Sequence, residues 1–101
     1  MHTYRSDMTN PDLAAEALRA VGVEFRRRGH VIRLISGDYS GTRLDLSCGN
    51  ISTTVGRDKV GLLRQHYAEA KYKAECARMG IKVVSRYVES NGDIVLMCRT
   101  T

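Results

Sequence analysis

The sequence predicts a single α+β domain over residues 1–101, in which two helices pack on one face of a mainly antiparallel sheet. Two stretches repeat their apolar residues at steps of three and four, the spacing of an amphipathic helix. Elsewhere apolar and polar residues alternate in pairs of short segments joined by glycine-containing turns, as in β-hairpins. The expected order of elements is therefore (β)αββββαββ, with residues 2–6 as the short first strand. Antiparallel strands beside helices are typical of the α+β class.

The first predicted helix begins after Thr9 or Asn10, either of which can cap it, with Pro11 at its first position. Proline is tolerated there because the amide that it lacks would have no partner within the helix. Gly22 is expected to end the helix, since glycine readily adopts the left-handed conformation of a helix C-terminus. The buried face should contain Leu13, Ala14, Ala17, Leu18 and Val21.

A hairpin is expected over residues 23–36, with a two-residue turn at Arg28-Gly29. This register places Glu24 directly opposite Arg33, and opposite charges in such a pair contribute about 0.2–1 kcal/mol. The face that points to the core then carries Val23, Phe25, Ile32 and Leu34.

After a loop at residues 37–41, a further hairpin is expected with its turn at Gly49-Asn50. Apolar and polar side chains alternate cleanly on both of its strands, which separates two faces. The residues expected to point inward are Leu44, Leu46, Cys48, Ile51, Thr53 and Val55. The residues expected to point outward are Arg43, Asp45, Ser47, Ser52 and Thr54.

The second predicted helix lies between Arg57 and Gly80. Asp58 is its expected N-cap, because a carboxylate can accept hydrogen bonds from the free amides of the first turn. The stripe expected to be buried comprises Val60, Leu63, Tyr67, Ala70, Ala74 and Ala77. A second stripe repeats every seven residues and comprises Arg57, Arg64, Lys71 and Arg78. We interpret this second stripe as a solvated face, with an anion-binding ridge as the alternative.

The C-terminal hairpin is predicted from Asn91-Gly92, because both central positions of a type I′ turn need a positive φ. This turn pairs Val88 with Val95 and places Leu96 in the core. The core face should carry Ile81, Val83, Tyr87, Ile94, Leu96 and Cys98. The opposite face should carry Lys82, Val84, Arg86, Val88, Val95, Met97 and Arg99.

Composition limits the class of protein. The 16 lysines and arginines exceed the 11 aspartates and glutamates by 5, which favours an anionic partner. The three cysteines have no C-x-x-C spacing, so we expect reduced, structural thiols without metal. No apolar run approaches the roughly 18 residues of a membrane span, and the N-terminus lacks the hydrophobic segment of a signal peptide. We expect a cytoplasmic protein that uses no cofactor and contacts no membrane.

The sequence also lacks the motifs of common enzymes. It contains no H-E-x-x-H, no G-x-S-x-G and no phosphate-binding glycine loop followed by Lys-Ser/Thr. We therefore expect a small non-enzymatic binding module, serving as an adaptor or an inhibitor.

The expected site is the sheet face opposite the helices, formed by the outward residues of all three hairpins. Its cations are Arg26, Arg33, Arg43, Lys82, Arg86 and Arg99. Aliphatic side chains lie between these cations, so the face suits an acidic protein partner, or it is covered by a second copy of the chain. Binding of nucleic acid or a nucleotide through the arginines is the alternative, although no aromatic side chain on this face would stack on bases.

The C-terminal half resembles the domain-of-unknown-function family 1257, the hypothetical chloroplast reading-frame type, mainly over residues 57–99. The shared pattern is a tyrosine-alanine helix, a Gly-apolar strand start, a turn containing glycine and an apolar last strand. It is carried here by Tyr67-Ala68, Ala77, Gly80-Ile81, Val83-Val84, Gly92, Ile94 and Leu96. The segments PDLAAEALRAVGVEF and LDLSCGN fit the same layout, whereas the middle of this chain is shorter and lacks an aromatic-containing stretch. The resemblance implies the fold and assigns no activity to any residue.

Overall fold

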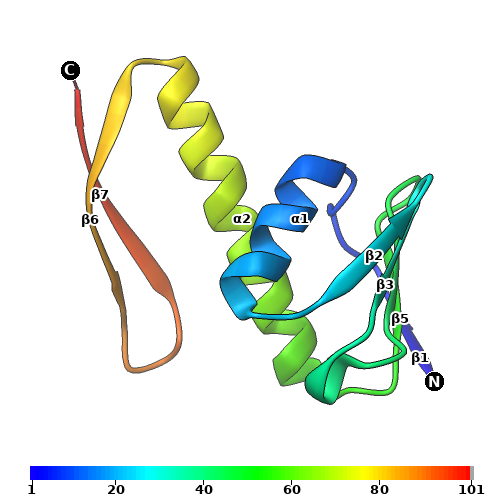
Figure 1. The fold of residues 1–101 in the computed structure, drawn as a ribbon. Coiled ribbons are helices and arrows are strands. Elements are labelled where there is room, and N and C mark those ends of the chain that lie inside the picture. The colour runs from blue at the N-terminus through cyan, green and yellow to red at the C-terminus, as the bar shows by residue number, and fades with distance from the viewer. Residues whose placement is uncertain (101) are drawn as a thin grey trace.

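The computed structural model describes residues 1–100, apart from the side chains of Val84 and Thr100. These residues form two helices, α1 (Pro11–Val21) and α2 (Arg57–Arg78), and two antiparallel sheets. Both helices lie on one face of the larger sheet, and a C-terminal hairpin lies on the other side of α2 (Figure 1). The predicted α+β class and the order (β)αββββαββ are thus confirmed.

The larger sheet, called the large sheet below, has the strand order β1-β5-β4-β3-β2. Its strands are β1 (His2–Tyr4), β2 (Phe25–Arg28), β3 (Val31–Leu34), β4 (Arg43–Asp45) and β5 (Asn50–Thr53). All neighbouring strands are antiparallel. A short 3₁₀ helix, η1 (Gly37–Tyr39), connects β3 to β4.

The hydrophobic core lies between the inner face of the large sheet and the two helices. The strands contribute Ile32, Leu34, Leu44 and Ile51, which are almost completely buried, as predicted. The helices contribute Ala14, Ala17, Leu18, Val60 and Leu63. The Tyr67 hydroxyl accepts hydrogen bonds from the backbone amides of Thr9 and Asn10, at 3.3 and 3.1 Å. This contact ties α2 to the start of α1.

The predicted ends of α1 are confirmed, whereas the predicted start of α2 is wrong. Asn10 caps α1, because its Oδ1 accepts hydrogen bonds from the amides of Asp12 and Leu13 at 2.9 and 3.2 Å. α2 begins after Gly56, so Asp58 lies in its first turn instead of capping it. There the carboxylate still lies near the positive end of the helix dipole. Neither helix in residues 1–100 is long and apolar enough to cross a membrane.

The hairpin of β2 and β3 has its turn one residue later than predicted, at Gly29-His30. Gly29 has a φ of 61°, which suits the first central position of a type II′ turn. The register moves by two residues, so Arg33 lies opposite Arg26 and not opposite Glu24. A shift by two leaves every side chain on its predicted face, because the side-chain period of a strand is two.

The hairpin of β4 and β5 also keeps its faces but not its turn. Asp45 pairs with Asn50, which leaves residues 46–49 as a four-residue loop. Leu46 is buried as expected, but Cys48 is exposed, because it belongs to the loop and not to a strand. The Asp45 side chain accepts hydrogen bonds from the Ser47 amide and hydroxyl, which stabilise the loop.

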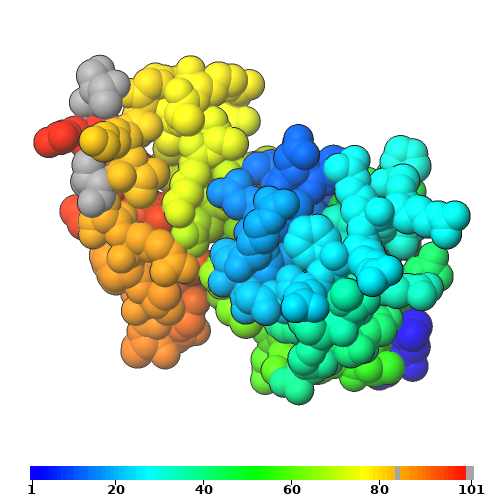
Figure 2. All heavy atoms as spheres, viewed as in Figure 1, coloured from blue at the N-terminus to red at the C-terminus, as the bar shows by residue number. Residues whose placement is uncertain are grey.

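The last two strands, β6 (Ile81–Val88) and β7 (Ile94–Thr100), form a separate sheet, called the hairpin below. The expectation that their outer face continues that of the large sheet is therefore wrong. The reason is length: α2 spans about 33 Å, whereas the strands of the large sheet span only about 10–13 Å. The C-terminal half of α2 extends past the large sheet and contacts the hairpin, which Figure 2 shows as a lobe set apart from β1–β5.

The buried stripe of α2 changes direction where the helix leaves the large sheet. Ala70 is buried as predicted, but Ala74 and Ala77 are exposed. Cys76 is 1% exposed instead, because the hairpin packs on a different side of the helix than α1 does.

The register of the hairpin is one residue away from the prediction. The Glu89 amide donates to the Asp93 carbonyl at 2.8 Å, so the loop has three residues and no type I′ turn. Gly92 has a φ of 91°, whereas Asn91 has a negative φ. The Asn91 side-chain oxygen accepts a hydrogen bond from the Asp93 amide at 3.0 Å. This arrangement is the three-residue loop that ends in a left-handed glycine.

The new register pairs Val88 with Ile94 and Arg86 with Leu96. A one-residue slip exchanges the faces of a strand, so Tyr87, predicted to be buried, is 48% exposed. A bulge between Val83 and Ser85 returns the first part of β6 to its predicted face. The faces predicted for β7 remain correct, but Leu96 is only half-buried and Cys98 is exposed.

Gly49→Ala should destabilise the fold by about 3 kcal/mol. Gly49 has a φ of 80°, and a Cβ on it would lie 2.1 Å from the backbone oxygen of Ser6. Gly41→Ala is the matched control, because its φ is 90° but a Cβ there would meet no atom within 4 Å. The control should lose only about 1–2 kcal/mol. Urea titrations of both variants measure the difference, and equal losses would contradict the proposed clash.

Candidate binding surface

Three arginines form a single row across the outer face of the large sheet. Arg26 on β2 lies opposite Arg33 on β3, and Arg33 lies opposite Arg43 on β4. The same row continues to Ser52 on β5 and Thr3 on β1. Neighbouring strands lie about 4.8 Å apart, so the arginines start from closely and evenly spaced backbone positions. We call Arg26, Arg33 and Arg43 the arginine row.

All three side chains of the arginine row are exposed. Within residues 1–100, none of them forms an ion pair or a side-chain hydrogen bond. Two acidic residues lie one row away on the same face: Asp45, opposite Val31, and Glu24, whose backbone carbonyl accepts a hydrogen bond from the Ile35 amide. Hydrogen bonds from the Ser47 side chain and amide lower the pKa of Asp45, so this carboxylate is occupied by its own loop. Among the described residues, neither Asp45 nor Glu24 forms an ion pair with the arginine row.

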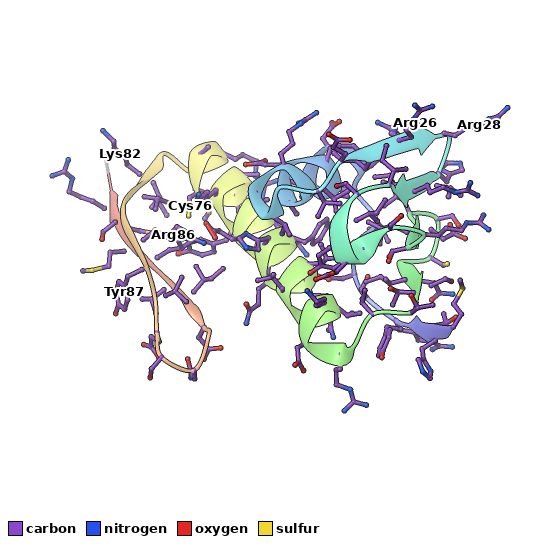
Figure 3. All side chains as sticks on the ribbon, turned by 60° about the horizontal axis from the view of Figure 1, so that its bottom comes forward. Arg26, Arg28, Cys76, Lys82, Arg86 and Tyr87 are labelled. Atoms are coloured by element: carbon purple, nitrogen blue, oxygen red, sulfur yellow. The ribbon has the colours of Figure 1, made fainter. Side chains whose placement is uncertain are left out.

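A fourth arginine extends this basic surface. Arg28 lies on the same face of β2, opposite Val31, and Figure 3 shows Arg26 and Arg28 extending away from the rest of the molecule. Arg28 was not among the predicted site residues, because the predicted turn included it. The signal was present in the run of three arginines at 26–28, in which alternate residues must share a face.

The structure does not bring the six predicted cations together. Lys82 and Arg99 face each other across β6 and β7, on the exposed side of the hairpin that also carries Met97. They belong to the hairpin and not to the large sheet, so they form a second, smaller basic patch. The predicted site is thus divided into the arginine row and this pair.

Arg86, the sixth predicted residue, lies on the side of the hairpin that faces α2. Its Nε donates to the two carboxylate oxygens of Glu69 at 2.6 and 3.0 Å. The Glu69 side chain is only 9% exposed, and Lys73 Nζ lies 3.2 Å from the same carboxylate. Arg86 therefore links the hairpin to α2. It lies on the face towards α2 and not on the predicted outer face, because the register of the hairpin differs by one residue from the predicted one.

The electrostatics of this link follow from its geometry. Burial raises the pKa of Glu69, but hydrogen bonds from Arg86 and Lys73 outweigh that effect and hold the pKa below its ordinary value of 4.5. The hydrogen bond with Glu69 raises the pKa of Arg86. Both groups are therefore ionised near neutral pH.

A groove of about 610 Å³ lies between α2 and the hairpin. Ala68, Tyr72, Ile94 and Leu96 line it with apolar atoms, and Glu69, Glu89 and Asp93 add carboxylates to its lining. The sequence does not predict this groove, because the groove forms only where the hairpin packs on α2 and not in the large sheet. Among the described residues, no group of three or more His, Cys, Asp or Glu could hold a metal ion.

Glu69→Gln should reduce stability by about 1 kcal/mol at pH 6 and by much less at pH 3. Since the folded pKa is depressed, the ionised carboxylate stabilises the fold above pH 4.5 and loses this effect as the pH falls through the folded pKa. Urea titrations at the two pH values measure this difference. Glu16→Gln is the control, because Glu16 is exposed on α1 and has no ion pair among the described residues. An equal loss for Glu69→Gln at both pH values would contradict the role of the charge.

Comparisons of the chain with models of protein families, with curated proteins and with solved structures gave no match. The resemblance to the domain-of-unknown-function family 1257 therefore stays a prediction from the sequence.

Proposed function

We propose that this protein is a small binding module that engages an acidic protein surface through the arginine row. The observation that carries this proposal is the register Arg26, Arg33, Arg43 across three adjacent strands, with no ion pair to the row among the described residues. Like charges directly opposite each other destabilise a sheet. Three aligned arginines therefore repel one another, and an anionic ligand bound to them would reduce this repulsion.

The chemistry of the outer face favours carboxylates on a protein. Guanidinium groups bind carboxylates with two parallel hydrogen bonds. On an open sheet face these groups can reach carboxylates on the surface of another protein, because no deep pocket encloses them. Val31 and Ile35 lie on the same face as the row and add apolar contact area. An interface core enriched in arginine and apolar atoms is typical of protein–protein recognition.

Nucleic acid is the second candidate, favoured by the uniform positive charge of the row. Phosphates bind guanidinium groups as carboxylates do. However, the outer face of the large sheet carries no Phe, Tyr or Trp among its described residues, so bases would find no stacking platform there. Such binding would be limited to the phosphate backbone and would weaken steeply with salt.

Arg33→Gln should stabilise the free protein by about 0.2–1 kcal/mol, because it removes the central charge of the row. The gain should be larger at low ionic strength than at high, since salt screens exposed charges. Urea titrations at two salt concentrations measure it, with Arg64→Gln on α2 as the control. A loss of stability on removing the Arg33 charge would show that the row is not repulsive.

The binding proposal is tested with the triple variant Arg26→Gln, Arg33→Gln, Arg43→Gln. Its matched control, Arg57→Gln, Arg64→Gln, Lys82→Gln, removes the same charge from exposed positions elsewhere. Binding to labelled polyglutamate, to single-stranded DNA and to duplex DNA is measured by fluorescence anisotropy. The row variant should bind polyglutamate roughly tenfold more weakly than the control variant does.

Equal binding of polyglutamate by the two variants would contradict the proposed site. Row-dependent binding of DNA, with no binding of polyglutamate, would replace the acidic protein by nucleic acid as the ligand. Circular dichroism shows whether both variants fold, which is expected because none of these side chains belongs to the core.

A further inference from the structure

Tyr72, Cys76 and Cys98 form a cluster where the hairpin meets α2, far along the chain from the arginine row. Tyr72 and Cys76 are one helical turn apart, and such residues are neighbours on a helix surface. The Tyr72 hydroxyl lies 3.4 Å from the Cys98 Sγ, within hydrogen-bond distance. Figure 3 shows Cys76 on the side of α2 that faces the hairpin.

Both thiols of this cluster affect the electrostatics of the Tyr72 hydroxyl. Hydrogen bonds with Cys98 and with Cys76 raise the pKa of Tyr72 to about 12, so the hydroxyl keeps its proton near neutral pH. Burial raises the pKa of the Cys76 thiol, and hydrogen bonds with Tyr72 and Cys98 act on it as well. Tyr72 thus places the Cys98 sulfur of β7 beside the turn of α2 that carries Cys76.

The two thiols differ in access to solvent. Cys98 is exposed, whereas Cys76 is 1% exposed. A small oxidant therefore reaches Cys98 first, and Cys76 lies behind it. Exposed thiols beside a second cysteine are the typical sites of reversible oxidation.

We propose that Cys98 and Cys76 are a redox-active pair, in which a peroxide oxidises Cys98 and Cys76 then closes a disulfide between β7 and α2. In the first step the Cys98 thiol releases its proton, its sulfur attacks a peroxide oxygen and the O–O bond breaks. Cys98 sulfenic acid forms, and the leaving hydroxide takes up the released proton as water. In the second step the Cys76 thiol releases its proton, its sulfur attacks the Cys98 sulfur and the S–O bond breaks. The leaving hydroxide takes up this proton as the second water. The balance is two thiols and one hydrogen peroxide giving one disulfide and two waters.

The disulfide would change how firmly the hairpin is held. A two-stranded hairpin is marginally stable alone, and this one is attached to α2 through the Arg86–Glu69 ion pair and half-buried apolar side chains. A covalent bond from Cys76 to Cys98 encloses the whole turn between α2 and β6 and most of the hairpin. It therefore restricts local opening of the hairpin while leaving the large sheet and the arginine row unchanged.

The test treats the reduced full-length protein with one equivalent of hydrogen peroxide. Intact mass should fall by about 2 Da for the two hydrogens lost, and peptide mapping should find Cys76 joined to Cys98. Hydrogen exchange of the hairpin amides should then slow by roughly tenfold or more. Cys48 supplies the matched control, because it is exposed in the loop between β4 and β5: Cys48→Ser should give the same product.

Two further variants assign the roles of the pair. Cys76→Ser should accumulate Cys98 sulfenic acid, which dimedone traps, because no resolving thiol remains. Cys98→Ser, at an exposed position, should give no disulfide within the chain. The proposal would be overturned if Cys48→Ser abolished the product, if the bond formed between two chains, or if Cys98 were oxidised in the wild type without joining Cys76.

Discussion

The architecture of this protein depends on the length of α2. Its first half buries Val60, Leu63 and Tyr67 against α1 and the large sheet. Its second half extends beyond the short strands of that sheet and would expose Cys76 to solvent if nothing packed there. The hairpin packs there. The two ends of α2 therefore contact different partners on different sides of the helix: α1 and the large sheet at the first half, and the hairpin at the second.

This division explains why the outer face of the large sheet is open. Both helices pack on the inner face, and the hairpin, which might have extended the sheet, is held on α2. The outer face is then solvated, and an antiparallel sheet tolerates polar residues there. Its four exposed arginines are compatible with the fold because they point to water, although their alignment does not contribute to stability. The outer face is therefore the surface that carries the proposed binding site.

The contact between α2 and the hairpin is of a different kind. It combines a partly buried ion pair, Arg86–Glu69, with apolar residues that remain half-exposed and with a groove of about 610 Å³. Such a contact has less buried apolar area than the core, and segments of this kind open more readily than core strands. The thiols of Cys76 and Cys98 lie at this contact, at the place where a covalent bond would alter the motion of the hairpin most directly.

The sequence by itself determined the order of the elements, the ends of α1 and the inward faces of β2–β5, because these depend on local periodicity and capping. Errors of two or four residues in the registers of those hairpins left Ile32, Leu44 and Ile51 in the core, since a strand repeats every two residues. The one-residue error in the last hairpin put Tyr87 and Arg86 on the wrong faces. The loop has three residues and not two, with a left-handed Gly92 and an Asn91 side chain that accepts a hydrogen bond from the Asp93 amide. Only the tertiary structure decided that the hairpin leaves the sheet, that three of the six predicted cations align, and that Cys98 lies beside Tyr72, one helical turn from Cys76. These outcomes depend on which distant segments pair and on how far α2 extends past its partners, and neither is encoded in the local pattern of residues.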